Sequence, residues 1–198
     1  MFTRIVTFTG ATDIDGGIAY VRDTVSPVLH QQKGFRGTTA SADRAGMVFS
    51  VLSLWETATD RENSESALLK VREEGQKVIG GQLTVELFEE VFLELVGKPV
   101  VGAQLLVRRV TMDPSKIDQN VAYFKNEVLP TIKANPGLLA VRNMINRTTG
   151  EGLTGTSWVD KTSLEAAAAD AETRVGQAEG RVVLGEQSQR ELVFVDLV

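Results

Sequence analysis

Cysteine is absent from the 198 residues, and histidine occurs only once, as His30. Without cysteine the chain can form no disulfide, no thiolate nucleophile and no cysteine-ligated zinc or iron–sulfur site. A single histidine also excludes a multi-histidine metal site within one chain. The sequence therefore predicts a protein with no metal site and no cofactor.

The chain also lacks long apolar runs and an excess of basic residues. No stretch of 18 apolar residues occurs, and the segment after Met1 lacks the apolar core of a signal peptide. The net charge is −5, whereas nucleic acids and anionic membranes bind concentrated basic surfaces. We expect a cytoplasmic globular protein with no nucleic-acid or membrane partner.

Aromatic residues are scarce, at 6%, and their positions reveal an internal repeat. A shift of 103 residues superimposes the only two tryptophans, Trp55 and Trp158, and the only two tyrosines, Tyr20 and Tyr123. Eleven of the 49 positions from 14 to 62 are identical, where ordinary residue frequencies give about three. The other nine identities are Ile14/Ile117, Asp15/Asp118, Ala19/Ala122, Val25/Val128, Pro27/Pro130, Gly34/Gly137, Arg44/Arg147, Thr59/Thr162 and Glu62/Glu165. The sequence predicts two modules, 1–97 and 103–198, with a Gly- and Pro-containing linker at 98–102.

Each module has the pattern β-α-β-β-α-β. First strands are expected at 3–9 and 104–111, third strands ending at Trp55 and Trp158, and a fourth strand near 85–95. Between the first two strands, apolar residues spaced three to four apart predict a helix with one buried face. Pro27 and Pro130 predict a kink in its last turn.

Helix starts are predicted from side chains that can accept hydrogen bonds from backbone N–H groups. Asp13 or Asp15 would cap the first helix of the first module, and Asp113, just before a proline, that of the second. The patterns Thr59-x-x-Glu62 and Thr162-x-x-Glu165 predict capping boxes at the second helices.

The third strand is apolar on both faces: Phe49, Val51 and Trp55 alternate with Val48, Leu52 and Leu54. A sheet covered by helices on one side only would have a polar opposite face. We expect helices on one face of each sheet and the sheet of the other module on the second face.

These modules resemble the dimeric α/β-barrel superfamily, and most of all its antibiotic biosynthesis monooxygenase (ABM) branch. The resemblance rests on PVLHQQKGF (27–35) and LSLWE (52–56), with PTIKANPGL (130–138) and TSWVD (156–160), and covers nearly the whole chain. It implies an α+β fold of tandem ferredoxin-like modules that form a dimeric α/β barrel within one chain, with a pocket between helices and sheet in each module.

The same resemblance implies either cofactor-free oxygenation of polycyclic aromatic substrates or haem degradation. Both activities commonly use an asparagine and the tryptophan, and haem degraders add a histidine on the second helix. Neither second helix contains histidine, so haem degradation is not expected. Val51 and Thr154 stand four residues before the tryptophans, where the aromatic-substrate oxygenases tend to have asparagine.

Trp55 and Trp158 are the best ligand-binding candidates, because an indole offers a flat apolar wall and one N–H donor. Alternatively, each tryptophan simply packs beneath a helix. Tyr20 and Tyr123 could present hydroxyls to the pockets, although they lie outside the apolar stripe of their helices, and packing or exposure is the alternative.

The charged candidates are His30 and Arg108. His30 could act as a general base, since histidine titrates near neutral pH, or could interact with the carbonyls at its helix end. Arg108 and Arg109 are adjacent on a strand, so their side chains face opposite sides of the sheet. One of them could therefore enter a pocket, and Arg108 is the candidate. Ion pairs with fourth-strand glutamates are the favoured alternative for these arginines and for Arg4; the candidate partners are Glu86, Glu89, Glu90 and Glu94.

Two functions remain open. The first is an ABM-like cofactor-independent monooxygenase acting on a small aromatic or polyketide-like molecule, with a tryptophan as wall and His30 as base. The second is a non-catalytic small-molecule-binding or interaction protein on the same scaffold. An enclosed cavity that touches Trp55 or Trp158 and includes an ionisable side chain would favour the first. The sequence predicts an intrachain pseudo-dimer and leaves further homodimerisation open.

Overall fold

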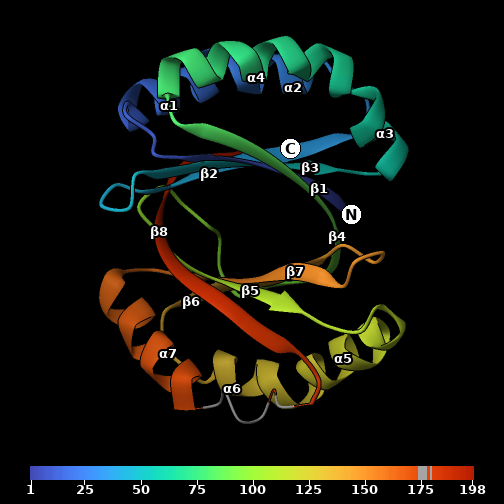
Figure 1. Cartoon of the computed structure of the whole chain (residues 1–198). Coiled ribbons are helices and arrows are strands. Elements are labelled where there is room, and N and C mark those ends of the chain that lie inside the picture. The colour runs from blue at the N-terminus through green and yellow to red at the C-terminus, as the bar shows by residue number, and fades with distance from the viewer. Residues whose placement is uncertain (174–177, 179) are drawn as a thin grey trace. The chain divides into compact units, whose positions relative to one another are not determined.

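A computed structural model describes residues 1–173, 178 and 180–198 (Figure 1). Its strands are hydrogen-bonded in the closed order β1-β3-β2-β8-β5-β7-β6-β4. The strands are β1 (Phe2–Thr9), β2 (Phe35–Asp43), β3 (Val48–Trp55), β4 (Gln82–Leu95), β5 (Gln104–Thr111), β6 (Leu138–Ile145), β7 (Glu151–Trp158) and β8 (Val183–Leu197). The α+β class and the α/β-barrel fold expected from the sequence are confirmed.

The chain forms two compact units that differ from its two sequence halves. The first unit comprises Met1–Leu87 and Glu191–Val198, and the second comprises Phe88–Arg190. The difference arises because the long strands β4 and β8 each contribute one part to either unit. The first unit therefore holds β1, β3 and β2 with the end of β8, and the second holds β5, β7 and β6 with the end of β4.

Helices cover one face of the strands in each unit (Figure 1). In the first unit they are α1 (Ile14–Tyr20), η1 (Val21–Val25), α2 (Ser26–His30), α3 (Ala58–Asn63) and α4 (Glu65–Ile79). In the second unit they are η2 (Pro114–Lys116), α5 (Ile117–Tyr123), η3 (Phe124–Val128), α6 (Leu129–Lys133) and α7 (Lys161–Thr173). Within the described residues, no helix is both long enough and apolar enough to cross a membrane.

The two prolines are accommodated by a widened helical turn rather than by a break. The segments η1 and η3 are π-helical and lie directly before Pro27 and Pro130. Proline lacks the N–H of a regular α-helical hydrogen bond, and a π turn shifts the bonding pattern so that the helix can continue. The predicted kink thus takes the form of a π turn in both units.

The starts of the second helices differ from the prediction by two residues. Thr57 caps α3 by accepting a hydrogen bond from the Asp60 backbone N–H, at 3.0 Å, and Asp160 accepts one from Ser163, at 2.8 Å. Thr59 and Thr162 lie inside the helices, so they are not caps. A threonine followed three residues later by an acidic residue occurs at Thr57 as well as at Thr59. Thr57 has the extended backbone of a helix cap, so the cap lies there. Asp13 and Asp113 cap the first helices, as expected.

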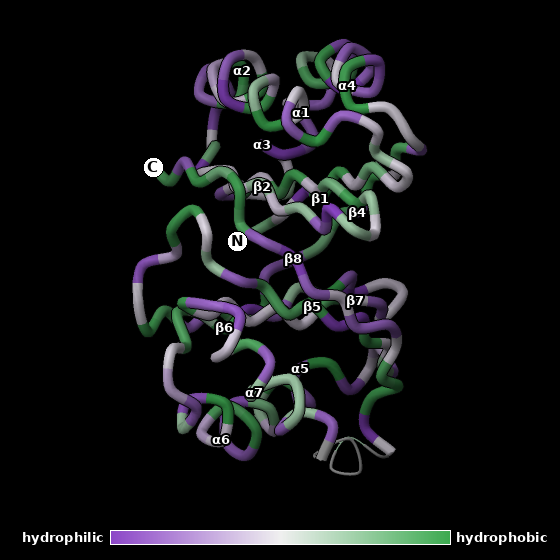
Figure 2. Tube along the Cα trace, turned by 90° about the vertical axis from the view of Figure 1, so that its left-hand side faces the viewer, coloured by the Kyte–Doolittle hydropathy of each residue, from purple (hydrophilic) through white to green (hydrophobic). Residues whose placement is uncertain are grey.

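Apolar side chains between helices and sheet form the core of each unit. One cluster of the first unit includes Phe8, Val21, Phe49 and Ile79, and one of the second includes Leu129, Val141, Trp158 and Leu164. Along α4, hydrophobic and hydrophilic positions alternate with the helical period (Figure 2), because one side of the helix faces the sheet.

Strand register gives the exact correspondence between the two units. Val6 of β1 lies opposite Val51, and Arg108 of β5 lies opposite Thr154, 103 positions after Val51. Arg108 therefore corresponds to Val6. Arg4 lies opposite Ser53 and therefore corresponds to Leu106.

Candidate ligand-binding site

A cavity of about 190 Å³ lies in the second unit, between the sheet and the helices. Strands β5, β7 and β6 form its floor, and α5, η3, α6 and α7 contribute to its walls. Its surface is mostly apolar, with Leu106, Phe124, Ile132 and Trp158 among the lining side chains. The cavity touches Trp158 and the ionisable side chain of Arg108, but it is partly open rather than enclosed as the first of the two functions requires.

Polar side chains follow one row across the cavity floor. Thr154 on the central strand β7 lies directly opposite Arg108 on one side and Asn143 on the other. Residues at the same register level of neighbouring strands point to the same face of a sheet, and all three line the cavity. We call Arg108, Thr154 and Asn143 the polar row.

The Arg108 guanidinium forms hydrogen bonds with residues of two elements, strand β8 and helix α7. Its Nε donates to Gln187 Oε1 of β8, at 3.0 Å, and its Nη2 contacts both Gln187 and the Glu172 carboxylate of α7. The expected ion pair with a fourth-strand glutamate is therefore wrong for Arg108. The α7 carboxylate is the partner instead, because Arg108 lies on the sheet face that the helices cover. Nη1 has no hydrogen-bond partner among the described residues, and Arg108 lines the cavity.

Asn143 is 6% exposed, and its Oδ1 has no hydrogen-bond partner in the described part of the chain. A buried polar atom without a partner costs about 1–3 kcal/mol. Because Oδ1 is an acceptor, only a group that donates a hydrogen bond to it would recover that free energy.

At one end of the cavity, Arg181 supplies a second guanidinium group besides that of Arg108. Asn120 of α5 donates through Nδ2 to the Arg181 carbonyl, at 3.2 Å, and so fixes that backbone. The Arg181 guanidinium lies 4.0 Å from the centroid of the Tyr123 ring, within cation–π range. All three residues line the cavity.

The two tryptophans differ in what they touch. Trp158 is 1% exposed and lines the cavity, and its indole N–H donates to Thr156 Oγ1 at 2.8 Å. Trp55 is fully buried, lines no described cavity, and donates to Ser53 at 3.0 Å. Both N–H groups are therefore used within the protein, and of the two tryptophans only Trp158 lines a described cavity.

A smaller cavity, of about 50 Å³, lies in the first unit. Where the second unit has the polar row, the first has Val6, Val51 and Ala40 at the same register. Tyr20 lines this cavity, but its hydroxyl is bound to the Val71 carbonyl at 3.0 Å. Leu68 occupies the position 103 residues before Ala171 and reduces the space further.

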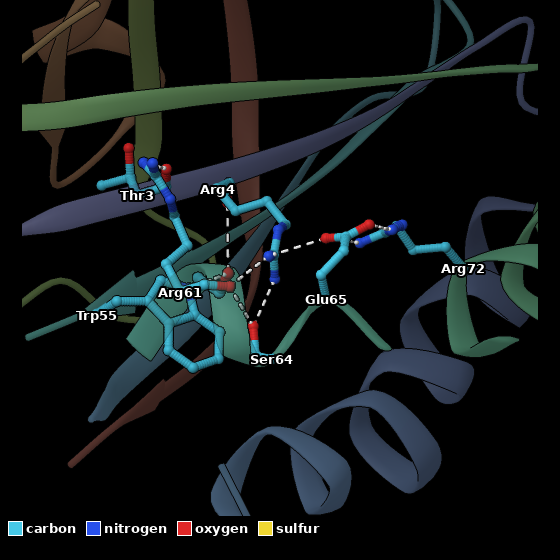
Figure 3. Close-up of polar contacts among 8 residues, drawn as sticks. Thr3, Arg4, Trp55, Arg61, Ser64, Glu65 and Arg72 are labelled. Carbon is cyan, nitrogen blue, oxygen red and sulfur yellow. Dashed lines mark hydrogen bonds and ion pairs between the residues drawn. The ribbon is translucent and has the colours of Figure 1, made fainter. Parts of the chain in front are cut away.

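Polar contacts of Arg4 join strand β1 to the helices of the first unit (Figure 3). It is 3% exposed and donates to Ser64 Oγ at 3.0 Å and to the Arg61 carbonyl at 2.6 Å; it also pairs with Glu65 at 3.0 Å. Burial is the main cause that lowers the Arg4 pKa to about 10, and Glu65 opposes it. This network joins β1 to α3 and α4, and its partners are helix residues rather than the expected fourth-strand glutamates.

His30 lies outside the lining of both described cavities. Its Nε2 is 2.8 Å from Asp196 Oδ2 of β8, which also accepts a hydrogen bond from Ser26. Both contacts end on one carboxylate oxygen, and the Ser26 hydroxyl is not directed at His30, unlike the relay of a catalytic triad. The structure thus brings Trp158, Tyr123 and Arg108 together but leaves His30, Trp55 and Tyr20 in the first unit.

Sequence reasoning missed Asn143, Asn120 and Gln187. None belongs to a recognisable motif, but a signal existed in the repeat itself. Asn143 stands where the first module has Ala40, and Asn120 where it has Gly17. Polar residues that replace small or apolar ones in only one of two related modules mark positions where the modules differ in role.

No protein-family model matches the chain. It is similar to two uncharacterised proteins of Mycobacterium tuberculosis. One, Rv2557, is 29% identical over 145 residues, which is 73% of this chain and 65% of the relative. The other, Rv2558, is 24% identical over 133 residues, 67% of this chain and 56% of the relative. The chain therefore spans less than two thirds of the length of these relatives.

Several solved structures are similar over nearly the whole chain. A Fusobacterium nucleatum protein described as a "putative monooxygenase" superimposes with a TM-score of 0.72 at 13% identity, covering 99% of this chain and 94% of that one. An "anthrone oxidase-like protein" superimposes with a TM-score of 0.69 at 15% identity, covering 98% and 92%. At such low identity the likeness establishes the fold, which the chain shares with monooxygenase-like proteins.

Proposed function

We propose that the second unit binds a small aromatic or polyketide-like molecule and acts on it as an ABM-like, cofactor-independent monooxygenase. The observation that carries this proposal is the apolar cavity of about 190 Å³ beside Trp158, with its polar side chains gathered in one row. The short ABM-like motifs and the monooxygenase-like structural neighbours support assignment to that family.

The size and lining of the cavity match a compact ring compound. An apolar cavity of about 150 Å³ holds benzene, whereas sites for drug-sized ligands measure about 300–1,000 Å³. A cavity of about 190 Å³ therefore suits one substituted ring or two small fused rings that lie against the Trp158 indole. Larger substrates would have to extend through its open side.

The chemistry needs an electron-rich substrate, because the substrate itself reduces oxygen. For an anthrone-type ring, the methylene carbon loses two hydrogens and gains one oxygen as a carbonyl, and the other oxygen atom leaves as water. The protein would bind and orient the ring, exclude bulk water and stabilise the enolate that forms before oxygen reacts. Arg108 is the charged residue best placed for the last task.

Turnover and binding can be tested together with anthrone, a three-ring substrate that would extend through the open side of the cavity. We expect the purified protein, with a chelator present, to convert anthrone to anthraquinone in air and not under nitrogen, with one atom of labelled oxygen gas in the product. Absence of product in air, despite measurable binding, would support the alternative of a non-catalytic binding protein. Absence of both binding and product would contradict the proposal.

Two variants, one that fills the cavity and one on the exposed side of the same helix, test where the ligand binds. Ala171→Leu introduces the residue that the first module has at Leu68, and it should weaken ring binding about tenfold because the cavity loses volume. Ala169→Leu, on the exposed side of the same helix, is the matched control and should bind normally. Equal binding by both variants would place the ligand elsewhere.

A further inference from the structure

The first unit contains a polar cluster at positions where the second unit is apolar. Arg4, Arg61, Ser64 and Glu65 correspond to Leu106, Leu164, Ala167 and Ala168, and these four counterparts are all buried. The same fold therefore forms without the cluster. Buried ion pairs can often be replaced by apolar side chains with no loss of stability. Stability of the fold alone thus does not account for the cluster.

The cluster has more positive than negative charge. Among its labelled residues, Figure 3 shows the guanidinium groups of Arg4, Arg61 and Arg72 and a single carboxylate, that of Glu65. Glu65 contacts Arg4 Nη2 at 3.0 Å and both Nη atoms of Arg72. Burial, and then the charges of Arg72 and Arg61, lower the pKa of Arg4 against the opposing effect of Glu65. A further negative charge would therefore be stabilised here.

The two arginines that share Glu65 also line the cavity of about 50 Å³. The rest of the lining is apolar apart from Ser53 and Tyr20, whose hydroxyl binds a backbone carbonyl, and it includes no Asp, Glu or His. Arg4 Nε is buried and has no hydrogen-bond partner in the described part of the chain. The cavity is thus a small apolar space bounded by two guanidinium groups, which suits an anion with a short apolar tail.

Glu65 is the member of the cluster that can leave it most easily. Its side chain is 51% exposed, whereas those of Arg4 and Arg72 are 3% and 12% exposed. Rotation of the Glu65 side chain into water leaves its backbone in place in the first turn of α4. Arg4 stays fixed meanwhile, because it donates to Ser64 Oγ and to the Arg61 carbonyl. The guanidinium groups then remain in position for another carboxylate.

From this geometry we propose that the first unit binds a short-chain aliphatic carboxylate, which replaces the Glu65 carboxylate on Arg4 and Arg72 and places its alkyl tail in the small cavity. Arginine binds carboxylates through strong paired hydrogen bonds. The cavity has about a third of the 150 Å³ that holds the six carbons of benzene, so a tail of about two carbons fits. This site lies in the other unit from the proposed monooxygenase site and does not depend on that function.

Propionate, which has a two-carbon tail, is the probe. Isothermal titration at constant ionic strength compares it with propan-1-ol, which has no charge, and with inorganic phosphate, which has no tail. We expect propionate to bind saturably at one molecule per chain. Its affinity should be at least tenfold higher than that of either comparison compound, because only propionate satisfies both the guanidinium groups and the cavity.

Charge variants test the exchange with Glu65. Glu65→Gln should raise the affinity for propionate about tenfold, because a neutral amide competes less well for the arginines. Glu73→Gln, the same change at an exposed position of α4, is the matched control and should bind as the unchanged chain does. Arg4→Leu, which introduces the residue of the second unit, should abolish saturable binding. Arg72→Met should weaken binding at least tenfold, and it leaves the buried hydrogen bonds of Arg4 intact.

Each contrary result would overturn the proposal. Absence of saturable propionate binding, both in the unchanged chain and in Glu65→Gln, would show that the site does not exist. Equal affinity for propan-1-ol would show that the guanidinium groups do not hold the ligand, and equal affinity for phosphate that the cavity does not accept a tail. Undiminished binding by Arg72→Met, or weaker binding by Glu65→Gln than by the unchanged chain, would contradict the exchange of carboxylates.

Discussion

At the scale of single residues, identity between the modules marks contacts that hold each unit together. Arg44 pairs with Asp15 at 2.7 Å, and the same pair recurs as Arg147 with Asp118 at 2.9 Å. In both cases the arginine of a hairpin reaches the start of the first helix. The residues that differ, above all Asn143, lie at the cavity instead.

This contrast explains what could be read from the sequence at this scale. The tryptophan at the end of the third strand was predictable, because its spacing and chemistry recur. Which tryptophan would face a cavity was not, because that depends on volumes contributed by distant residues such as Leu68 and Ala171. The ion-pair partner of Arg108 was not predicted, since Glu172 comes from a helix 64 residues away.

Asp196 gives a residue-scale prediction about pH. Burial raises its pKa, but hydrogen bonds from Ser26 and His30 and the charge of His30 outweigh burial, so the pKa lies below its ordinary value. A lowered acid pKa adds stability above the ordinary value of about 3.9, and that stability is lost as the pH falls through the folded-state pKa. Asp196→Asn should lower the free energy of unfolding by about 1–3 kcal/mol at pH 7.

Urea unfolding at pH 7 and at pH 3 checks this prediction. The difference in the free energy of unfolding between Asp196→Asn and the unchanged chain should shrink at pH 3, because this pH lies below the ordinary pKa of about 3.9 and the carboxyl of the unfolded chain is then mostly protonated. Asp23→Asn, which removes a fully exposed pairing with Arg22, should show no measurable change at pH 7. A stability difference for Asp196→Asn that is the same at both pH values would contradict the electrostatic account.

At the scale of elements, helix boundaries depend on local backbone geometry that residue patterns show only roughly. Strand ends at Trp55 and Trp158 were predicted exactly, since a tryptophan followed by polar residues is a clear boundary. The caps of the second helices were misplaced, because the same spacing begins at Thr57 and at Thr59. The π turns before Pro27 and Pro130 were not predicted beyond a kink, since no residue preference specifies them.

The corrected caps make a paired prediction for the second helices. Thr57→Ala should lower the free energy of unfolding by about 1 kcal/mol, because the Asp60 N–H loses its acceptor. Asp160→Ala should act in the same direction on α7. Thr59→Ala and Thr162→Ala, inside the helices, should leave stability unchanged or slightly raised. Thermal unfolding of the four variants tests this, and a larger loss from Thr59→Ala than from Thr57→Ala would favour a cap at Thr59 instead.

At the scale of the whole molecule, one scaffold occurs twice with different interiors. The first unit closes its interior with the Arg4 network and bulky side chains, and the second keeps a cavity. The fold was predictable because a repeated hydrophobic pattern constrains it throughout. The asymmetry was not, since it depends on side-chain volumes summed over many positions. We expect one ring ligand per chain, bound in the second unit.

A fluorescence titration with 4-nitrophenol tests this central claim most directly, because each unit contains one tryptophan. A Trp55→Phe chain, which reports from Trp158 alone, should be quenched to saturation at one ligand per chain. A Trp158→Phe chain, which reports from Trp55, should show only the unsaturable loss due to light absorption by the free ligand. Saturable quenching of Trp55 with no response from Trp158, in chains that retain the same circular dichroism, would contradict the account.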